Sequence, residues 1–386
     1  MTGRKHAVLS ASAAHRWLIC PPSARLEESF PDTESPYAAE GTLAHEICEL
    51  KVRQKFIRKQ SAATFKKKLK KLQANELYQN EMEGYTEDYL DYVSKIVYSF
   101  DSAPHVAAEV RVDFSHVVPE GFGTCDCVVI HGGQMHIVDF KYGKNVHVSA
   151  SGNPQLKLYA LGAIKAYGMF YPVEKVVMHI VQPRIDNNNQ AEMSIEDLNT
   201  WARIIKPWAE QAYKGEGEFK ADEETCRFCR AKATCRARAE KNLELAEEDF
   251  RIPPLLSNDE AGEVLKKARD IKQWVTDLEA WALKEILAGG SVAGWKAVEG
   301  RSNRAFADQD KAFEIIKASG VDEGMLYERR PITLTAVEKL LGKKEFTELL
   351  ADQIVKPPGK PTLAPETDKR EAITLKTTAE EDFKEE

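Results

Sequence analysis

The sequence predicts an α/β fold in which helices flank a mixed central sheet. Apolar residues at helical spacing fill residues 40–59 and 80–100, and three β-rich runs follow between residues 105 and 143. Next come a helix over 152–168, a strand over 173–183 and a helix over 194–215. Because strands and helices alternate in this order, we expect a mixed sheet covered by helices.

Capping and breaking residues support the helix assignments. A short helix near the N-terminus has Ser10 or Ser12 as its cap, and Pro21 stops it because proline cannot continue the hydrogen-bond ladder. The helix over 152–168 has Pro154 in its first turn and Gly168 past its end. This asymmetry is typical of helix termini.

Composition divides the chain into three parts. Residues 1–245 contain the alternating elements and form the main predicted domain. Residues 246–355 start with a proline-containing linker and continue with a long charged helix, so we expect a mainly helical region there. Residues 356–386 are rich in proline and then acidic, which is typical of an extended tail.

The charge and hydropathy of the chain limit its location and partners. The 386 residues carry a net charge of −7, so the whole-molecule charge does not indicate nucleic-acid binding. The basic run Lys66–Lys71 is a local exception, and it either contacts a phosphate backbone or is a solvated helix face. No apolar stretch is long enough to span a membrane and no signal peptide is evident, so we expect a cytoplasmic protein without membrane partners.

Charged and polar residues gather where the predicted strands end. Asp139 and Lys141 project from one face of a strand because side chains alternate. A hairpin brings Asp126, on the preceding strand, toward Asp139. Two carboxylates at one place repel each other unless a cation lies between them, and a divalent ion would also activate a water. Gln155 and Tyr159 share one face of the following helix. Taken alone, each motif has an alternative interpretation: a solvated surface pair for Asp139 and Lys141, a polar helix edge for Gln155 and Tyr159, and a core histidine for His45.

The order of these motifs resembles the RecB-like branch of the PD-(D/E)xK nuclease superfamily. That branch has a helical histidine, then G-x-x-D, then (D/E)-x-K, then Q-x-x-x-Y, and the corresponding stretches here are "GTLAH", "GTCD", "DFK" and "QLKLY". The resemblance implies a PD-(D/E)xK core. It also implies that the metal ligands are His45, Asp126, Asp139 and the Phe140 carbonyl, that Asp126, Asp139 and Lys141 are catalytic, and that Gln155 and Tyr159 position the substrate. Glu109 is a further candidate near the metal, with pairing to Arg111 or to solvent as the alternative.

The cysteines extend the resemblance. A subset of RecB-like nucleases, including those of CRISPR adaptation and of recombination complexes, has one cysteine before the histidine motif and three after Q-x-x-x-Y. Cys20, Cys226, Cys229 and Cys235 match that distribution, which implies a [4Fe–4S] cluster that closes the domain. A four-cysteine zinc site is the alternative occupant, and unligated cysteines are a third interpretation. The remaining cysteines, Cys48, Cys125 and Cys127, are expected to be core residues.

The resemblance implies a Mg²⁺- or Mn²⁺-dependent deoxyribonuclease, with exonuclease action favoured. The resemblance is stronger still to an uncharacterised phage and prophage RecB-like group. This sequence shares with that group the stretches at Ser10–Pro21 and Lys356–Arg370. The expected partners are therefore DNA and proteins of phage recombination or replication. Two alternatives stay open: a catalytically silent DNA-binding or scaffold protein of the same fold, and a zinc-stapled interaction protein.

Overall fold

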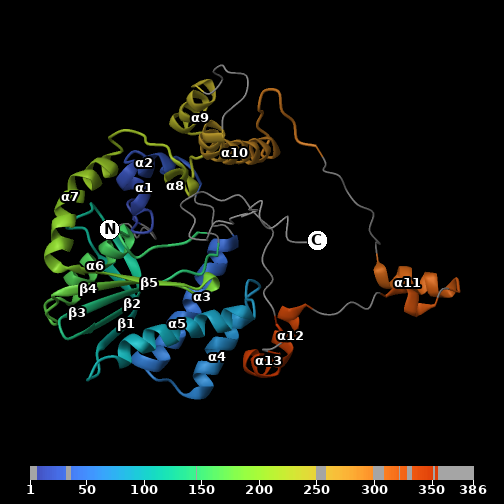
Figure 1. Cartoon of the computed structure of the whole chain (residues 1–386), viewed down its shortest axis with the longest axis horizontal. Coiled ribbons are helices and arrows are strands. Elements are labelled where there is room, and N and C mark those ends of the chain that lie inside the picture. Colours follow the sequence, from blue (N-terminus) through green and yellow to red (C-terminus); the bar gives the residue numbers. More distant parts are fainter. Residues whose placement is uncertain are drawn as a thin grey trace, which may run out of the picture. The chain divides into compact units, whose positions relative to one another are not determined.

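A computed structural model describes residues 7–31, 36–144, 146–248, 258–298, 308–320, 322–327, 333–350 and 353–354 (Figure 1). Contacts group the chain into two units, residues 1–288 and 289–386. No helix among the described residues is both long and apolar enough to cross a membrane. The predicted tail over 356–386 lies outside the described residues.

The first unit is built on one five-stranded sheet with the strand order β1-β2-β3-β4-β5. The strands are β1 (His105–Asp113), β2 (Phe122–His131), β3 (Gln134–Phe140), β4 (Lys175–Gln182) and β5 (Asn187–Ser194). The β3–β4 pair is parallel and the other three pairs are antiparallel. The structure therefore confirms the predicted mixed sheet. Strand β5 is not expected from the sequence, because its run of asparagines lacks the apolar alternation of a strand.

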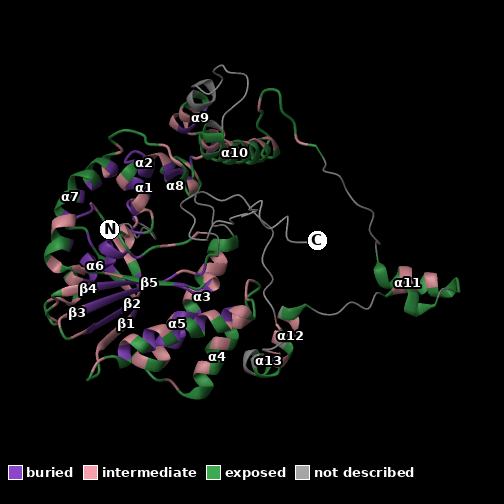
Figure 2. Ribbon diagram, viewed as in Figure 1, coloured by how far each residue is buried: buried purple, intermediate pink, exposed green. Residues whose placement is uncertain are grey.

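Helices cover both faces of the sheet, as predicted (Figure 1). One face packs against α1 (Ala14–Ile19), α2 (Ser23–Leu26), α6 (Pro154–Tyr167) and α7 (Ile195–Lys214). The other face packs against α3 (Pro36–Val52), α4 (Ala62–Gln73) and α5 (Glu81–Tyr98). The central strands β2, β3 and β4 are largely buried between these layers, whereas the edge strands β1 and β5 are mostly intermediate or exposed (Figure 2). Helix α6 is the crossover that a parallel β3–β4 pair requires.

Short helical turns complete the first unit. They are η1 (Glu27–Ser29), the π-helical η2 (Arg53–Ile57) and η3 (Pro183–Ile185). After α7 the chain forms α8 (Glu223–Arg227), α9 (Arg236–Glu248) and the long α10 (Asn258–Leu287).

Helix α10 belongs to the first unit, although the sequence analysis placed it with the C-terminal region. The physical reason is a buried ion-pair network. The guanidinium of Arg238, on α9, donates to Asp270 and Asp277 of α10 at 2.9 Å each. Because the buried Arg238 charge is paired with two carboxylates of α10, these ion pairs hold α9 and α10 together.

The second unit contains only helical elements among its described residues, as predicted for the C-terminal part. They are α11 (Gln309–Ala318), η4 (Glu323–Leu326), α12 (Leu334–Leu341) and α13 (Lys343–Leu350).

Candidate active site

Three carboxylates occupy one row across the sheet. Glu109 of β1 lies opposite Asp126 of β2, between the Ala108–Cys127 and Val110–Cys125 pairs. Asp126 and Asp139 are the next opposing positions after the last β2–β3 pair, which joins Cys127 to Val138. Such neighbours in a sheet are only about 5 Å apart, so the row concentrates negative charge.

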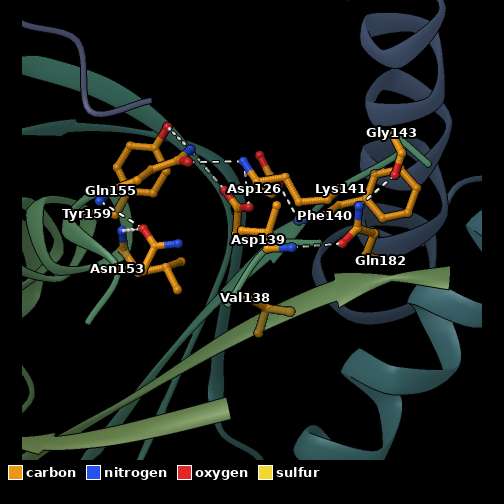
Figure 3. Close-up of polar contacts among 12 residues, drawn as sticks. Asp126, Val138, Asp139, Phe140, Lys141, Gly143, Asn153, Gln155, Tyr159 and Gln182 are labelled. Atoms are coloured by element: carbon orange, nitrogen blue, oxygen red, sulfur yellow. Dashed lines mark hydrogen bonds and ion pairs between the residues drawn. The ribbon is translucent and has the colours of Figure 1, made fainter. Parts of the chain in front are cut away.

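The β2 and β3 strands separate at this row. The backbone N–H of Phe140 donates to Asp126 Oδ2 at 2.7 Å, in place of a β2 carbonyl (Figure 3). The strict alternation expected for β2 also breaks here. Cys125 and Cys127 belong to different core clusters, whereas regular alternation along β2 is expected to place both on the face away from Asp126. That expectation was wrong because it assumed a regular strand, and the strand is irregular where it carries Asp126.

Asp139 and Lys141 form one network with the first turns of α6 (Figure 3). Lys141 Nζ lies 2.9 Å from Asp139 Oδ2 and donates to Gln155 Oε1 at 3.0 Å. Gln155 Nε2 donates to Asp139 Oδ1 at 3.1 Å and to the Tyr159 hydroxyl at 3.2 Å. Asn153 caps α6 by accepting from the N–H groups of its first turn, which fixes the position of Gln155. The four side chains that the sequence motifs singled out therefore meet at one place.

The Asp139 carboxylate is buried and only partly satisfied. Asp139 is 2% exposed, and its Oδ2 atom has an ion pair with Lys141 but no hydrogen bond among the described residues. Burial raises the pKa of Asp139, and although the Lys141 charge opposes this, the pKa stays above its usual value because Asp126 adds like charge. Burial lowers the pKa of Lys141, but the Asp139 carboxylate outweighs burial and raises it.

His45 reaches the site from α3. Its Nδ1 atom lies 3.4 Å from Asp126 Oδ1, and its ring packs edge-on against Phe140 with 5.2 Å between ring centroids. Burial lowers the pKa of His45, but the Asp126 carboxylate more than offsets burial, so the pKa is raised. Burial raises the pKa of Asp126, but His45 and the Phe140 N–H outweigh burial and lower it.

Among side-chain ligands, the observed cluster has Glu109 where the predicted set has Asp139. Ligand atoms of His45, Glu109 and Asp126 all lie within 4.8 Å of one another, and this is the one such group of three found among the described residues. Asp139 is not a member, because Lys141 and Gln155 hold its carboxylate. Glu109 is not paired to Arg111, whose guanidinium lies 4.2 Å from the Phe122 ring centroid.

A cleft of about 980 Å³ opens beside Lys141 and Gln155. Its wall includes residues from α1, α3, α8 and the β3–α6 connection, among them His15, Tyr37, Lys144, His147 and Arg227. Several of these side chains are basic or aromatic.

Two amide side chains for which the sequence predicts no role hold the β3–α6 connection. Gln182, at the end of β4, is 1% exposed and donates to the carbonyls of Gly143 and Val146 at 2.6 and 2.8 Å. Asn187 donates to Gln182 Oε1 and to the Val148 carbonyl, both at 2.8 Å. Little in the sequence indicates that Gln182 and Asn187 have this role, because an amide at a strand end is usually a turn residue.

Comparison with known proteins places the chain in a family. The model of a family described as "Protein of unknown function (DUF2800)" matches residues 6–371. The chain belongs to the DUF2800 family. Among solved structures, one described as "Crystal structure of SSO0001" is similar at 16% identity, with 50% of this chain and 85% of that chain covered and a TM-score of 0.24.

In this DUF2800 protein, the four distant cysteines of the sequence pattern line one small cavity: Cys20, Cys226, Cys229 and Cys235. None of them is in a disulfide, and the first three are buried. Burial raises the pKa of Cys20 and Cys226, and raises that of Cys229 to about 12. No three of these sulfurs lie within 4.8 Å of one another in the described part of the chain.

Polar contacts bring the N-terminal segment to this cysteine loop. The carboxylate of Glu27 is ion-paired with Arg16, and its Oε1 atom accepts from the Arg230 N–H at 2.7 Å. These contacts hold Cys20 near the three later cysteines.

The basic run Lys66–Lys71 lies on α4, on the face of the sheet that α3 and α5 cover. Helix α4 has no buried residue, so its lysines are open to solvent.

Proposed function

We propose that this protein is a RecB-like PD-(D/E)xK deoxyribonuclease that hydrolyses phosphodiesters with Mg²⁺ or Mn²⁺, as an exonuclease of phage or prophage recombination or replication. The observation that carries the proposal is the Asp139–Lys141–Gln155 network next to Asp126, at the wall of a large cleft. A surface ion pair would be solvated, whereas Asp139 is 2% exposed.

The residues present fit a divalent cation. Asp139 Oδ2 is buried with Lys141 as its only partner among the described residues, and Asp126 lies opposite Asp139 across the sheet. Asp126, Asp139, His45 and the Phe140 carbonyl would hold the ion, as the family resemblance implies. Oxygen ligands suit Mg²⁺, and an imidazole favours Mn²⁺. When bound, such an ion supplies an activated water and Lewis-acid polarisation of the phosphate.

Lys141 supplies the fixed positive charge of the site. Its ammonium is held between the Asp139 carboxylate and Gln155 Oε1, so it is oriented before the substrate arrives. A preorganised cation at this place stabilises the charge that develops on the phosphate oxygens during hydrolysis. Gln155 keeps Asp139 and Lys141 in register, and Tyr159 in turn holds Gln155.

The four-cysteine cavity supports a structural cluster in the same proposal. Ligands to a multi-iron cluster bind different iron atoms, so their sulfurs are farther apart than ligands of one zinc ion. The resemblance to iron–sulfur RecB-like nucleases is what favours [4Fe–4S] over zinc in this cavity. The cluster would tie α1 and α2 to the segment that follows α7, and so close the domain.

Digestion of end-labelled single- and double-stranded DNA with Mn²⁺ or Mg²⁺ tests the nuclease proposal. Asp139→Ala and Lys141→Ala should each lower the cleavage rate by about 100-fold or more, since each removes charge that acts on the transition state. Lys165→Ala is the matched control, because Lys165 on α6 forms an exposed ion pair with Asp113. Equal cleavage by all four proteins would contradict the proposed site, and DNA binding without cleavage by the native chain would favour the scaffold alternative.

Anaerobic purification tests the cluster. A brown protein with broad visible absorption and iron in stoichiometric amount is expected, and Cys226→Ala should abolish the colour. Cys48→Ala is the control, because Cys48 is buried in the core between the sheet and helices α3 and α5 and does not line the four-cysteine cavity. A colourless, zinc-loaded native protein would overturn the iron–sulfur assignment.

A further inference from the structure

We infer that helix α4, together with the turn before it, binds the phosphate backbone of duplex DNA outside the cleft. The inference rests on the proposed function, because that function supplies DNA as the substrate. It gives a role to the basic run Lys66–Lys71, whose residues do not line the cleft beside Lys141.

Cationic side chains are concentrated in residues 50–75. This stretch has ten lysines and arginines and no aspartate or glutamate, although the whole chain has a net charge of −7. Lys51 and Arg53 form ion pairs with acidic residues of α5 and α3, and Lys55 donates to Ser94. The other seven are exposed and form no ion pair with any described residue: Arg58, Lys59, Lys66, Lys67, Lys68, Lys70 and Lys71.

Helix α4 presents its five lysines on one broad face, because a turn of 3.6 residues brings them around the same side. Leu69 and Leu72 lie on the opposite side and pack against the core beneath α3 and α5. Ser61 caps the helix by accepting from the Thr64 N–H at 3.2 Å. The lysines therefore project from a regular helix whose apolar side is anchored in the domain.

The lysines of α4 repel one another. Lys66 and Lys70 are one turn apart, as are Lys67 and Lys71, and like charges at this spacing destabilise a helix. No acidic residue within the helix relieves the repulsion. A polyanion lying along the lysine face would relieve it.

The C-terminal end of α4 lies next to the cleft wall. Gln73, its last residue, donates to the Tyr78 hydroxyl at 3.4 Å and to Glu83 Oε2 at 3.3 Å. Gln79 and Glu81, in the same stretch, line the cleft. A nucleic acid that follows α4 toward its C-terminal end therefore reaches the candidate active site.

The dimensions and chemistry of the lysine face favour duplex DNA over a single strand. A rise of 1.5 Å per residue makes α4 about 18 Å long, and a duplex carries one charge per about 1.7 Å, so on the order of ten phosphates pass along it. The lysine face has no aromatic side chain on which an unpaired base could stack.

Protein and lipid partners fit this face less well. Lysine is depleted in protein–protein interfaces, whose centres are built from aromatic, methionine and arginine side chains. An amphipathic helix that binds a membrane buries its apolar side in the lipid. In α4 that side is already used, because Leu69 and Leu72 pack within the domain.

Fluorescence anisotropy of a labelled DNA duplex with the whole chain tests the inference, over a range of salt concentrations and with EDTA present so that no cleavage occurs. The test variant carries Lys67→Gln, Lys70→Gln and Lys71→Gln. A matched control removes the same charge from exposed positions of α7, on the other face of the sheet (Figure 1): Arg203→Gln, Lys206→Gln and Lys214→Gln. Circular dichroism establishes that both variants are folded.

We expect the α4 variant to bind the duplex on the order of tenfold or more weakly than the native chain near physiological salt. Its slope of log Kd against log salt should fall by about 2–3, because each lost phosphate contact removes about 0.9. The α7 variant should keep the native slope. An unchanged slope in the α4 variant would overturn the inference, and so would an equal fall in both variants, because only net charge would then matter.

Other ligands separate the remaining outcomes. A loss confined to single-stranded DNA of the same length would overturn the assignment to a duplex. Lost binding to vesicles of phosphatidylserine and phosphatidylcholine, with duplex affinity unchanged, would overturn it in favour of a lipid surface. The proposed nuclease fails by a different result: a native chain that binds the duplex through α4 but cleaves no DNA with Mn²⁺ or Mg²⁺.

Discussion

Gln155 links the Lys141 ammonium to the Asp139 carboxylate in the candidate site. It accepts from Lys141 Nζ at 3.0 Å and donates to Asp139 Oδ1 at 3.1 Å, so it fixes the distance between the cation and the carboxylate. Tyr159, one helical turn later, contacts the same amide at 3.2 Å. An amide suits this position because it donates and accepts at once, whereas a carboxylate can only accept when ionised.

Replacement of Gln155 by leucine tests this positioning role. In the proposed nuclease, we expect Gln155→Leu to lower kcat for DNA cleavage by about 10- to 100-fold, because side chains that orient ligands have effects of this size. Mn²⁺ affinity measured with the same protein should fall less than in Asp139→Asn. Gln190→Leu, at an exposed position of β5, should leave both quantities unchanged. A native rate of DNA cleavage by the Gln155→Leu protein would contradict this role in the proposed nuclease.

The sequence predicted these residues but not the arrangement of Glu109. The period of two in a strand placed Asp139 and Lys141 on one face, and helical spacing placed Gln155 and Tyr159 on another. Glu109 could not be assigned in this way, because its left-handed backbone departs from strand alternation. A local conformation of that kind depends on surrounding structure rather than on propensity.

At the scale of elements, the β3–α6 connection is held by amides from β4 and β5. Gln182 donates to Gly143 and Val146, and its Oε1 accepts from the Val148 N–H at 3.3 Å. Asn189 accepts from the Ala150 N–H at 2.6 Å. The connection starts after Lys141 and ends at the cap of α6, so its shape sets where Lys141 and Gln155 meet.

Gln182→Leu should loosen this connection. The substitution removes four hydrogen bonds made by a buried side chain, and we expect it to lower the free energy of unfolding by about 2–4 kcal/mol. Hydrogen exchange of residues 146–150 should accelerate more than that of the β3 strand. Asn188→Leu is the control, because Asn188 is exposed in the same polar run. Equal exchange rates in Gln182→Leu and the native chain would rule out this anchoring.

At the scale of the whole molecule, two buried histidines link stability to pH. The rings of His136 on β3 and His179 on β4 are stacked, with Nδ1 of the first 2.9 Å from Nε2 of the second. Tyr92 of α5 lies 3.1 Å from the outer nitrogen of His179. Burial, with a contribution from Lys175, lowers the pKa of His136 to about 4. Burial together with His136 lowers that of His179 to about 3.

This pair should make the protein less stable in mild acid. Both folded-state pKa values lie below the unfolded value of about 6.5, so the unfolded chain binds more protons as the pH falls below 6.5. The free energy of unfolding should then fall by up to about 1.4 kcal/mol per pH unit for each histidine until the folded pKa is reached. Urea unfolding between pH 7 and 4.5 measures the slope. His179→Gln should make it shallower, whereas replacement of the exposed His147 should not.

The sequence by itself determined which side chains are candidates for a functional site and how the helices and strands succeed one another. Strand alternation, helix caps and the spacing of the Asp139, Lys141, Gln155 and Tyr159 positions are local properties, so they are readable along the chain. Only the tertiary structure decided that Cys20 shares a cavity with three cysteines more than 200 positions away, and that Glu109 rather than Asp139 lies beside His45. It also decided that α10 packs on α9 through Arg238. The physical reason is that these proximities depend on how distant segments pack and where a strand departs from regular geometry, and neither is encoded in local spacing.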